Sequence, residues 1–421
     1  MKWLALAAAL VAMPAAGALA RGRPKLLRLG IGLLAFLPFI GERFTMNLYA
    51  LPAYRGDSLG FEVALVDLVA LALFVAAPKR EAPAAWRVPR ALYLLAVLAS
   101  IPGADRPLYA LFSTWKLLRM YFVFAVATRY VRRPELTPAA LTGLALGVVY
   151  VTATALHDRY GLGILRASGA MPHSNTLGMA VNLVYPTSLA LLLAGRGGWL
   201  APACIGGAGL CVILGQSRGS LALFALAGAL VFAGTARRGL SARKIGIALG
   251  VVFAGLVVLG QSLDSLIARF ENAPKSSAEA RHRFNDAAAM MLADHPLTGI
   301  GINHYSHAVS EMGYGDRAGV LAVDRHGVAH HVYWLTLAEL GLLGLLAYLG
   351  TLLPPLVRAL RGAFRARGDP RADVLLGLSA GLTVTYLQGL MEWVARQTEV
   401  SYMFWLSLAL VDALTRQLRR R

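Results

Sequence analysis

The sequence predicts an all-α, polytopic membrane protein with about twelve transmembrane helices and one large loop outside the membrane. Of its 421 residues, 57% are hydrophobic and only 15% are charged, against about 25% charged residues in a typical soluble domain. The hydrophobic residues form long blocks, and about 20 consecutive apolar residues are enough to cross a bilayer as a helix. The basic residues gather in alternate loops, which is typical of membrane proteins with a fixed orientation. This composition excludes a disordered chain, a collagen and an ordinary soluble enzyme.

Twelve hydrophobic segments follow one another and are the predicted spans: 26–40, 61–77, 91–103, 108–128, 139–156, 176–194, 200–216, 220–234, 245–261, 332–353, 374–391 and 400–414. Residues 3–20 form one further apolar stretch, which ends in a sequence that resembles a signal-peptide cleavage site. We expect this stretch to be an extra or partial membrane segment. We also expect one integral membrane domain, made of N-terminal helices at 1–260, a large periplasmic loop at 261–331 and C-terminal helices at 332–421.

The alternate loops that we place in the cytoplasm hold 25 of the 41 Lys and Arg residues. These loops are 21–28, 78–90, 129–138, 195–199, 235–244, 358–373 and 415–421. The net charge of +19 is therefore read as an orientation signal, and not as a surface for nucleic acid. Cys204 and Cys211 lie in one apolar block, so we expect neither a disulfide framework nor a thiolate metal site.

The loop at 261–331 holds seven of the nine histidines. It is much longer than an ordinary connection, and such loops are usually functional or disordered. Ser276 to Glu279 form a capping box, which predicts the start of a helix. The residues that follow place an apolar face at helical spacing: Ala280, Phe284, Ala287 and Met291.

Basic residues at three places are candidates for binding phosphate. Arg281 and Arg283 lie near the expected start of the loop helix, where the helix carries a partial positive charge; the alternative is a solvated basic pair. Arg218 lies between two spans with little room for a loop, so it is a functional candidate or a snorkelling arginine. Lys116 and Arg119 share one face of the fourth span, and they would either snorkel or contact a lipid-linked phosphate.

His330 and His331 directly precede the tenth span. An imidazole at that interface can act as an acid, a base or a ligand. Four loop histidines have spacings that zinc sites use, namely His304, His307, His326 and His330. Because no carboxylate or cysteine pattern completes a known zinc motif, we expect no metal.

At these residues the sequence resembles the O-antigen ligase and O-antigen polymerase superfamily. The likeness runs from about Leu165 to Tyr348 and has five segments in order: Ser168–Thr176, Gln216–Ser220, Arg281, Ala293–Gly301 and Ala329–Tyr333, with Glu339-Leu340-Gly341 following. There are two departures. His331 stands where the family commonly has Asn, and Asn285 stands where an aromatic residue is common.

The resemblance implies a membrane-embedded glycosyltransferase of the C-type architecture, in the bacterial inner membrane, with its site facing the periplasm. Such enzymes take glycan from undecaprenyl pyrophosphate, and the ligase branch moves it onto the lipid A–core oligosaccharide. The family is expected to need neither a metal, nor another cofactor, nor a nucleotide sugar. Membrane lipid would surround the protein, and no nucleic acid is expected as a partner.

That chemistry assigns roles to the candidate residues. Arg218 and Arg281 would stabilise charge that develops on the leaving pyrophosphate, with Arg283, Lys116 and Arg119 as further donor contacts. His330 would activate the acceptor hydroxyl as a base, and direct attack would invert the anomeric centre. The accessory candidates are His331, His173 and Asn175.

Three alternatives stay open at this point. An O-antigen polymerase would join repeat units to each other, and a protein O-oligosaccharyltransferase would use a serine or threonine acceptor. A transporter predicts broken helices and charged residues inside the membrane, and Asp67 and Glu339 are the main acids within the predicted spans.

Overall fold

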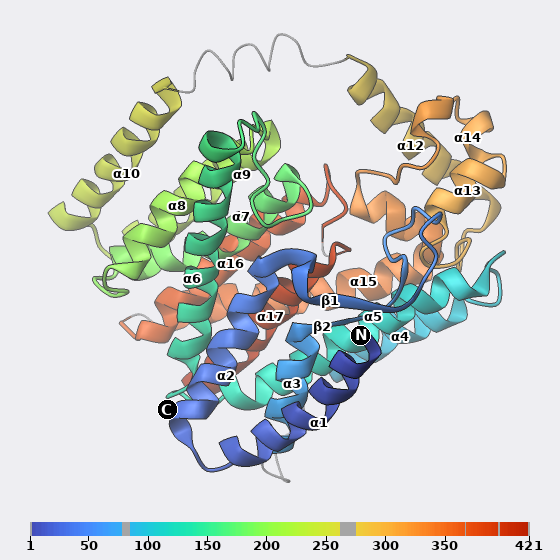
Figure 1. The fold of residues 1–421 in the computed structure, drawn as a ribbon. Coiled ribbons are helices and arrows are strands. Elements are labelled where there is room, and N and C mark those ends of the chain that lie inside the picture. The colour runs from blue at the N-terminus through green and yellow to red at the C-terminus, as the bar shows by residue number, and fades with distance from the viewer. Residues whose placement is uncertain (1, 78–84, 262–274, 367, 395, 420–421) are drawn as a thin grey trace.

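The computed structural model describes residues 2–77, 85–261, 275–366, 368–394 and 396–419, and it shows a largely helical bundle (Figure 1). Each predicted span coincides for most of its length with a helix. In chain order these helices are α2 (Pro24–Phe36), α3 (Leu65–Ala76), α4 (Arg87–Ala99), α5 (Pro107–Val131), α6 (Thr137–Leu156), α7 (Ser174–Leu193), α8 (Leu200–Leu214), α9 (Arg218–Ala236), α10 (Ala242–Gln261), α15 (Val332–Arg365), α16 (Pro370–Gln388) and α17 (Thr398–Arg419).

Among the described residues, seven helices are long and apolar enough to cross a membrane. They are α1 (Lys2–Ala20), α2 together with the 3₁₀ helix η1 (Leu37–Phe44), α5, α6 together with the π-helical turn η2 (His157–Gly161), α7, α9 and α15. Helices α3 and α8 are apolar but shorter. The chain is therefore a helical membrane protein, and the number of twelve crossings stays a prediction.

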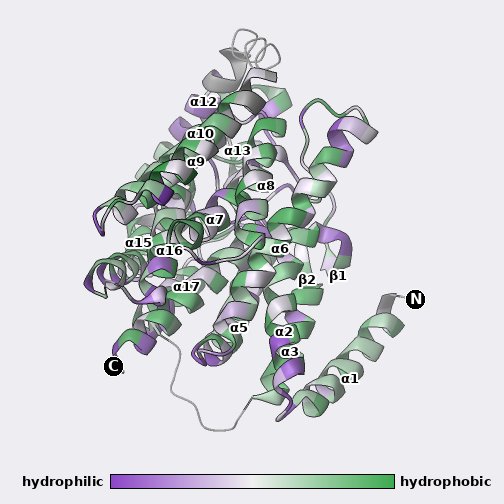
Figure 2. Ribbon diagram, turned by 90° about the vertical axis from the view of Figure 1, so that its left-hand side faces the viewer, coloured by the Kyte–Doolittle hydropathy of each residue, from purple (hydrophilic) through white to green (hydrophobic). Residues whose placement is uncertain are grey.

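The apolar stretch at the N-terminus forms a helix whose residues are mainly hydrophobic along its length (Figure 2). Leu4 and Val11 are 75% and 73% exposed, as expected of side chains that face lipid. Helix α1 packs against α3, and a Cβ at Gly17 would lie 2.1 Å from the carbonyl oxygen of Ala72. A small residue thus lets the two backbones touch, a common contact between membrane helices.

The expectation of a helical span over all of 61–77 is wrong at its beginning. Strand β2 (Gly60–Ala64) pairs antiparallel with β1 (Thr45–Ala50), and α3 starts only at Leu65. The carboxylate of Asp67 accepts a hydrogen bond from the Ala64 backbone N–H at 2.8 Å. This cap satisfies a donor at the start of α3 and sets the boundary between strand and helix.

Helix α7 lies in the interior of the bundle, next to α8, α9 and α16. Almost every side chain from Ser174 to Leu193 is buried. A Cβ at Gly381 of α16 would lie 2.3 Å from the carbonyl oxygen of Leu183, so these two helices also meet backbone to backbone. Because α7 is held on several sides, the residues at its N-terminus have a rigid support.

The described part of the large loop consists of α12 (Lys275–Asp294), α13 (Tyr305–Glu311), α14 (Tyr314–Arg317) and the 3₁₀ turn η3 (Ala322–Asp324). The predicted apolar face of the first helix is confirmed, because Phe284, Ala287 and Met291 are buried in one small core with Tyr305. Leu335 and Ala338 of α15 belong to the same core. Of the predicted capping box, the side chains of 276–278 lie outside the described residues, and Glu279 pairs with Arg283.

The prediction of a continuous helix over 332–353 is also wrong, because α15 is broken at Gly341, which has φ 63° and ψ −167°. The loop segment 296–301 fills the break. The N–H groups of Ile300 and Leu342 donate to the carbonyls of Ala338 and Pro296 at 3.0 and 2.9 Å. A Cβ at Gly341 would lie 2.3 Å from the backbone of Leu297, so the close approach requires glycine.

Candidate active site

Three helices begin around one segment of the chain, residues 389–394. Helix α15 begins beside it, since the N–H of Val332 donates to the carbonyl of Gly389 at 2.8 Å. Helix α9 begins beside it too, because a Cβ at Gly219 would lie 3.3 Å from the side chain of Met391. The third is α7, whose second residue, Asn175, reaches Glu392. Three partly positive helix ends therefore converge at one place, which favours the binding of an anion.

Glu392 lies at the centre of this place and joins three of the predicted residues. Its Oε1 accepts a hydrogen bond from Asn175 Nδ2 at 2.5 Å and lies 3.3 Å from Arg281 Nη2. Its Oε2 accepts from His330 Nδ1 at 3.1 Å. The Glu392 side chain is only 8% exposed, so these contacts replace the water that the carboxylate loses on burial.

The two neighbouring histidines have different surroundings. The contact with Glu392 uses Nδ1 of His330, so Nε2 is the nitrogen that can face a substrate, and the side chain is 35% exposed. His331 is the N-cap of α15, and its Nδ1 accepts from the N–H of Trp334 at 3.2 Å. Burial lowers the pKa of His331. The geometry therefore favours His330 as the reacting histidine, whereas His331 caps the N-terminus of α15.

Asn175 is itself held from two sides. Its Oδ1 accepts from Arg166 Nη2 at 2.7 Å, and its N–H donates to Nδ1 of His173, the N-cap of α7, at 3.1 Å. Arg166 Nε also donates to the carbonyl of Gly215 at 3.2 Å. Burial lowers the pKa of His173, and the charge of Arg166 lowers it further. The predicted accessory residues His173 and Asn175 therefore belong to the Glu392 cluster.

The remaining loop and interface arginines are placed differently. Arg218 is exposed and is the first residue of α9, close to the segment that carries Glu392. Arg283 lies 3.6 Å from Glu279, one turn earlier on α12. The structure thus brings Arg281 to Glu392 and turns Arg283 toward another acid.

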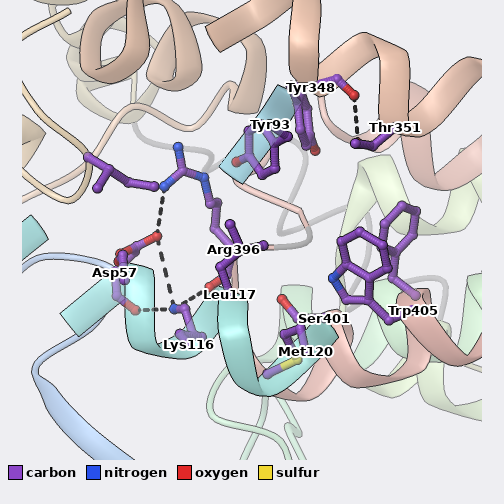
Figure 3. A pocket seen from close by; sticks show the side chains of 13 residues that line it. Asp57, Tyr93, Lys116, Leu117, Met120, Tyr348, Thr351, Arg396, Ser401 and Trp405 are labelled. Atoms are coloured by element: carbon purple, nitrogen blue, oxygen red, sulfur yellow. Dashed lines mark hydrogen bonds and ion pairs between the residues drawn. The ribbon is translucent and has the colours of Figure 1, made fainter. Parts of the chain in front are cut away.

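Lys116 and Arg119 belong to a buried ion network and do not snorkel, since they are 6% and 5% exposed. Lys116 Nζ donates to the carbonyls of Asp57 and Arg396, each at 2.7 Å (Figure 3). Arg119 contacts three acceptors, Asp67, Glu62 and Tyr402, at 2.8, 3.3 and 2.6 Å. The geometry does not favour the donor contact predicted for this pair, because both side chains are buried and pair with protein groups.

Arg396 connects that network to the large loop. Its Nη1 donates to Asp57 Oδ2 and its Nη2 lies beside Glu339 Oε2, both at 3.1 Å. Glu339 Oε1 in turn accepts from the N–H of Tyr305, the first residue of α13. Burial raises the pKa of Asp57, but Lys116 and Arg396 lower it more, so the net shift is downward. The adjacent cavity of about 40 Å³ is large enough for a few waters and too small for a sugar.

Three of the four loop histidines considered for zinc, His304, His307 and His330, have side-chain partners in the protein. Nδ1 of His304 donates to the carbonyl of Ile302 at 2.9 Å, and Nε2 accepts from the N–H of Arg106 at 3.0 Å. Nε2 of His307 lies 2.8 Å from Asp105. Within the described parts of the chain, no group of three or more His, Cys, Asp or Glu could hold a metal ion.

Sequence reasoning missed Glu392, Arg166 and Arg396. Glu392 and Arg396 lie in the short connection between the last two predicted spans. A charged residue at such a boundary is expensive unless it has a partner, and that signal could have marked them. Arg166 directly precedes the segment Ser168–Thr176 and carries no such signal.

The comparison with known families gives one match. A family model described as O-Antigen ligase covers residues 202–349. The matched range runs from α8 into α15 and contains Arg218, Arg281 and His330, whereas Asn175 and Glu392 lie outside it. No curated protein matches the chain.

Proposed function

We propose that this chain, whose residues 202–349 match a family model described as O-Antigen ligase, is an O-antigen ligase. It transfers polysaccharide from undecaprenyl pyrophosphate to a hydroxyl of the lipid A–core oligosaccharide, on the periplasmic side of the bacterial inner membrane. The observation that carries the proposal is the cluster around Glu392, where Arg281 and His330 meet at three helix N-termini. A cation and a base at one place are what transfer from a lipid pyrophosphate requires.

Arg281 and Arg218 bind the donor pyrophosphate in this proposal. The Arg281 guanidinium is 43% exposed, and its contact with Glu392 at 3.3 Å is longer than the 2.7–2.9 Å of strong charged pairs. A guanidinium has five N–H groups, so Arg281 can keep Glu392 and also hold phosphate oxygens. Negative charge grows on these oxygens as the glycosidic bond breaks, and preorganised arginines stabilise it.

His330 activates the acceptor in this proposal. Glu392 holds Nδ1–H and stabilises the positive charge that the ring acquires, and Nε2 takes the proton from the acceptor hydroxyl. The acceptor oxygen attacks the anomeric carbon, the bond from that carbon to the phosphate oxygen breaks, and undecaprenyl pyrophosphate leaves. Direct attack inverts the anomeric centre. The mechanism needs no metal, because arginines supply the positive charge and His330 supplies the base.

The distribution of charge supports a periplasmic site. Helices α15 and α17 start beside the Glu392 cluster and end in segments rich in arginine, such as 358–365 and 416–419. Arginine-rich ends of membrane helices favour the cytoplasm. The other end of both helices, which carries the cluster, then faces the periplasm.

The test is reconstitution of the full-length protein in liposomes with purified undecaprenyl-linked glycan and rough lipopolysaccharide. We expect the lipopolysaccharide to gain polymer on a gel with the wild type, and to lose that gain in Arg281→Ala and His330→Ala. Arg281→Lys should rescue poorly because lysine lacks the planar fork. Arg283→Ala, on the same helix but paired with Glu279, is the matched control. Full transfer by Arg281→Ala at equal expression contradicts the proposal.

The same assay separates the polymerase alternative, which the superfamily also contains. A polymerase lengthens the undecaprenyl-linked chain and leaves rough lipopolysaccharide unchanged. The broken helix at Gly341 and the buried Glu339 are the features that a transporter would share. Here Glu339 contacts Arg396 and the N–H of Tyr305, which gives it a structural role in holding the loop.

A further inference from the structure

We propose that a second site, at the opposite end of the bundle, binds the phosphate-bearing headgroup of an anionic phospholipid. The site is a groove between the C-terminal parts of α15 and α17. Its cations are four arginines: Arg358, Arg361, Arg365 and Arg419. This inference is independent of the proposed transfer activity, because the groove lies at the far ends of helices that start beside Glu392.

The groove has the size and shape of a binding site. Its volume is about 490 Å³, within the range of about 300–1,000 Å³ that is usual for small-molecule sites. Arg358, Arg361 and Arg365 repeat at intervals of three and four along one face of α15. The other lining residues are Gly362, Ala366, Thr415 and Leu418. A Cβ at Gly362 would lie 2.6 Å from Leu375 and 3.5 Å from Thr415, so glycine allows the helices to approach here.

The charge of the groove is not balanced by the acids nearest to it in the chain. Asp412 contacts Arg132 and Arg416, at 2.7 and 2.9 Å. Asp369 pairs with Arg371 at 2.5 Å. No acidic residue lines the groove among the residues that the structure describes. Like charges around one cavity repel each other, and an anion in the groove removes that repulsion.

Stabilisation of the helix C-termini does not account for all four arginines of the groove. Basic residues in the last turn of a helix stabilise its partly negative C-terminus, and the effect falls off within that turn. Arg365 and Arg419 are the last residues of their helices. Arg358 and Arg361 lie one to two turns earlier, and the Arg358 guanidinium lies 5.4 Å from the centre of the Trp86 ring. These two arginines extend the positive surface along the groove.

The surroundings favour a lipid over a soluble anion. The surface of α15 before and between the arginines carries exposed apolar side chains, with Leu353, Val357 and Leu360 at 51%, 41% and 38% exposure. A lipid whose headgroup lies in the groove can place its chains along this surface, whereas a free phosphate gains nothing from it. Basic pockets between helices at the cytoplasmic surface of a membrane bind anionic headgroups in this way.

The test compares lipids on the full-length protein in detergent, by native mass spectrometry and by the shift of the melting temperature. The probes are phosphatidylglycerol, phosphatidylcholine and inorganic phosphate. We expect phosphatidylglycerol to stay bound and to raise the melting temperature, and the other two to do neither. Arg361→Ala combined with Arg365→Ala should weaken phosphatidylglycerol binding about thirtyfold, since each basic residue near the surface contributes about 1 kcal/mol.

The matched control is Arg23→Ala combined with Lys25→Ala, which removes two exposed charges at the start of α2 and should bind phosphatidylglycerol like the wild type. Binding should also weaken as salt rises, which tests the wild type without any substitution. Equal retention of phosphatidylglycerol in the Arg361 and Arg365 double variant overturns the proposal. Equal stabilisation by inorganic phosphate overturns the assignment to a lipid.

Discussion

Glu392→Gln tests the cluster on which the proposed mechanism depends. The substitution keeps the size of the side chain and one acceptor oxygen, which can still receive the Asn175 amide. It removes the negative charge beside His330 Nδ1 and Arg281 Nη2, at 3.1 and 3.3 Å. A hydrogen bond to a charged group contributes about 1.5–3 kcal/mol. Two such contacts are weakened, and the part of their sum that is realised in the transition state, when His330 carries its proton, should be about 2–3 kcal/mol.

That loss predicts a fall in kcat/KM of about 30- to 150-fold. The fall should lie largely in kcat, because Glu392 acts on the charge that His330 gains during the reaction. The assay is transfer of glycan to rough lipopolysaccharide with purified protein, alongside the melting temperature. Glu392→Ala should be at least as inactive, since Asn175 and Arg281 also lose their acceptor.

Glu279→Gln is the matched control. Glu279 lies on the same helix as Arg281, is 62% exposed and pairs with Arg283 at 3.6 Å, and such surface pairs contribute about 0–1 kcal/mol. It should transfer glycan like the wild type. If Glu392→Gln keeps the wild-type kcat/KM at an unchanged melting temperature, the carboxylate does not assist His330, and the reasoning fails.

Three further predictions concern the loop, the histidines and metals. Gly341→Ala should lower the melting temperature and abolish transfer, because Gly341 has φ 63° and a Cβ there would lie 2.3 Å from the backbone of Leu297. The control is Gly350→Ala, which should leave both unchanged because a Cβ at Gly350 would lie 4.0 Å from its nearest neighbour. Burial lowers the pKa of His304, so the unfolded chain binds more protons below about pH 6.5. The melting temperature should therefore fall when the pH is lowered from 7.5 to 5.5, and His304→Gln should make that fall smaller. An equal dependence of the melting temperature on pH in the wild type and the variant contradicts this. Transfer should survive EDTA and dialysis; loss of activity that added zinc restores would contradict the metal-free mechanism.

Much of the fold could be predicted because a membrane helix is encoded in a local run of apolar residues. The face of α12 that packs Phe284, Ala287 and Met291 was predictable for a similar reason, since helical spacing is also local. The strand at 60–64 was not, because its last residues, Val63 and Ala64, continue directly into the apolar residues that begin α3. The break in α15 was not either, because Gly341 alone does not reveal that residues 296–301 will fill it.

Several residues of the candidate site could be predicted from the sequence, but Glu392, which joins them, could not. Arg281, His330 and Asn175 stand out by residue type and by motif. Glu392 is close to Asn175 only in space, because 217 residues separate them in the chain. The hydrogen-bond partners of Lys116 could not be predicted either. Its position on a span predicts either snorkelling or contact with a lipid-linked phosphate, and only the fold places the carbonyls of Asp57 and Arg396 around its ammonium group.

The way in which the loop fills the break in α15 has a consequence for protein engineering. The backbone hydrogen bonds between 296–301 and 338–343, and the shared core with Leu335 and Ala338, make loop and helix one folding unit. Residues 261–331 therefore lack, on their own, part of the core that their described helices need. A loop exchanged between relatives to change acceptor preference has to bring 332–343 with it, and a fusion partner inserted near 296–301 would separate two halves of a single helix.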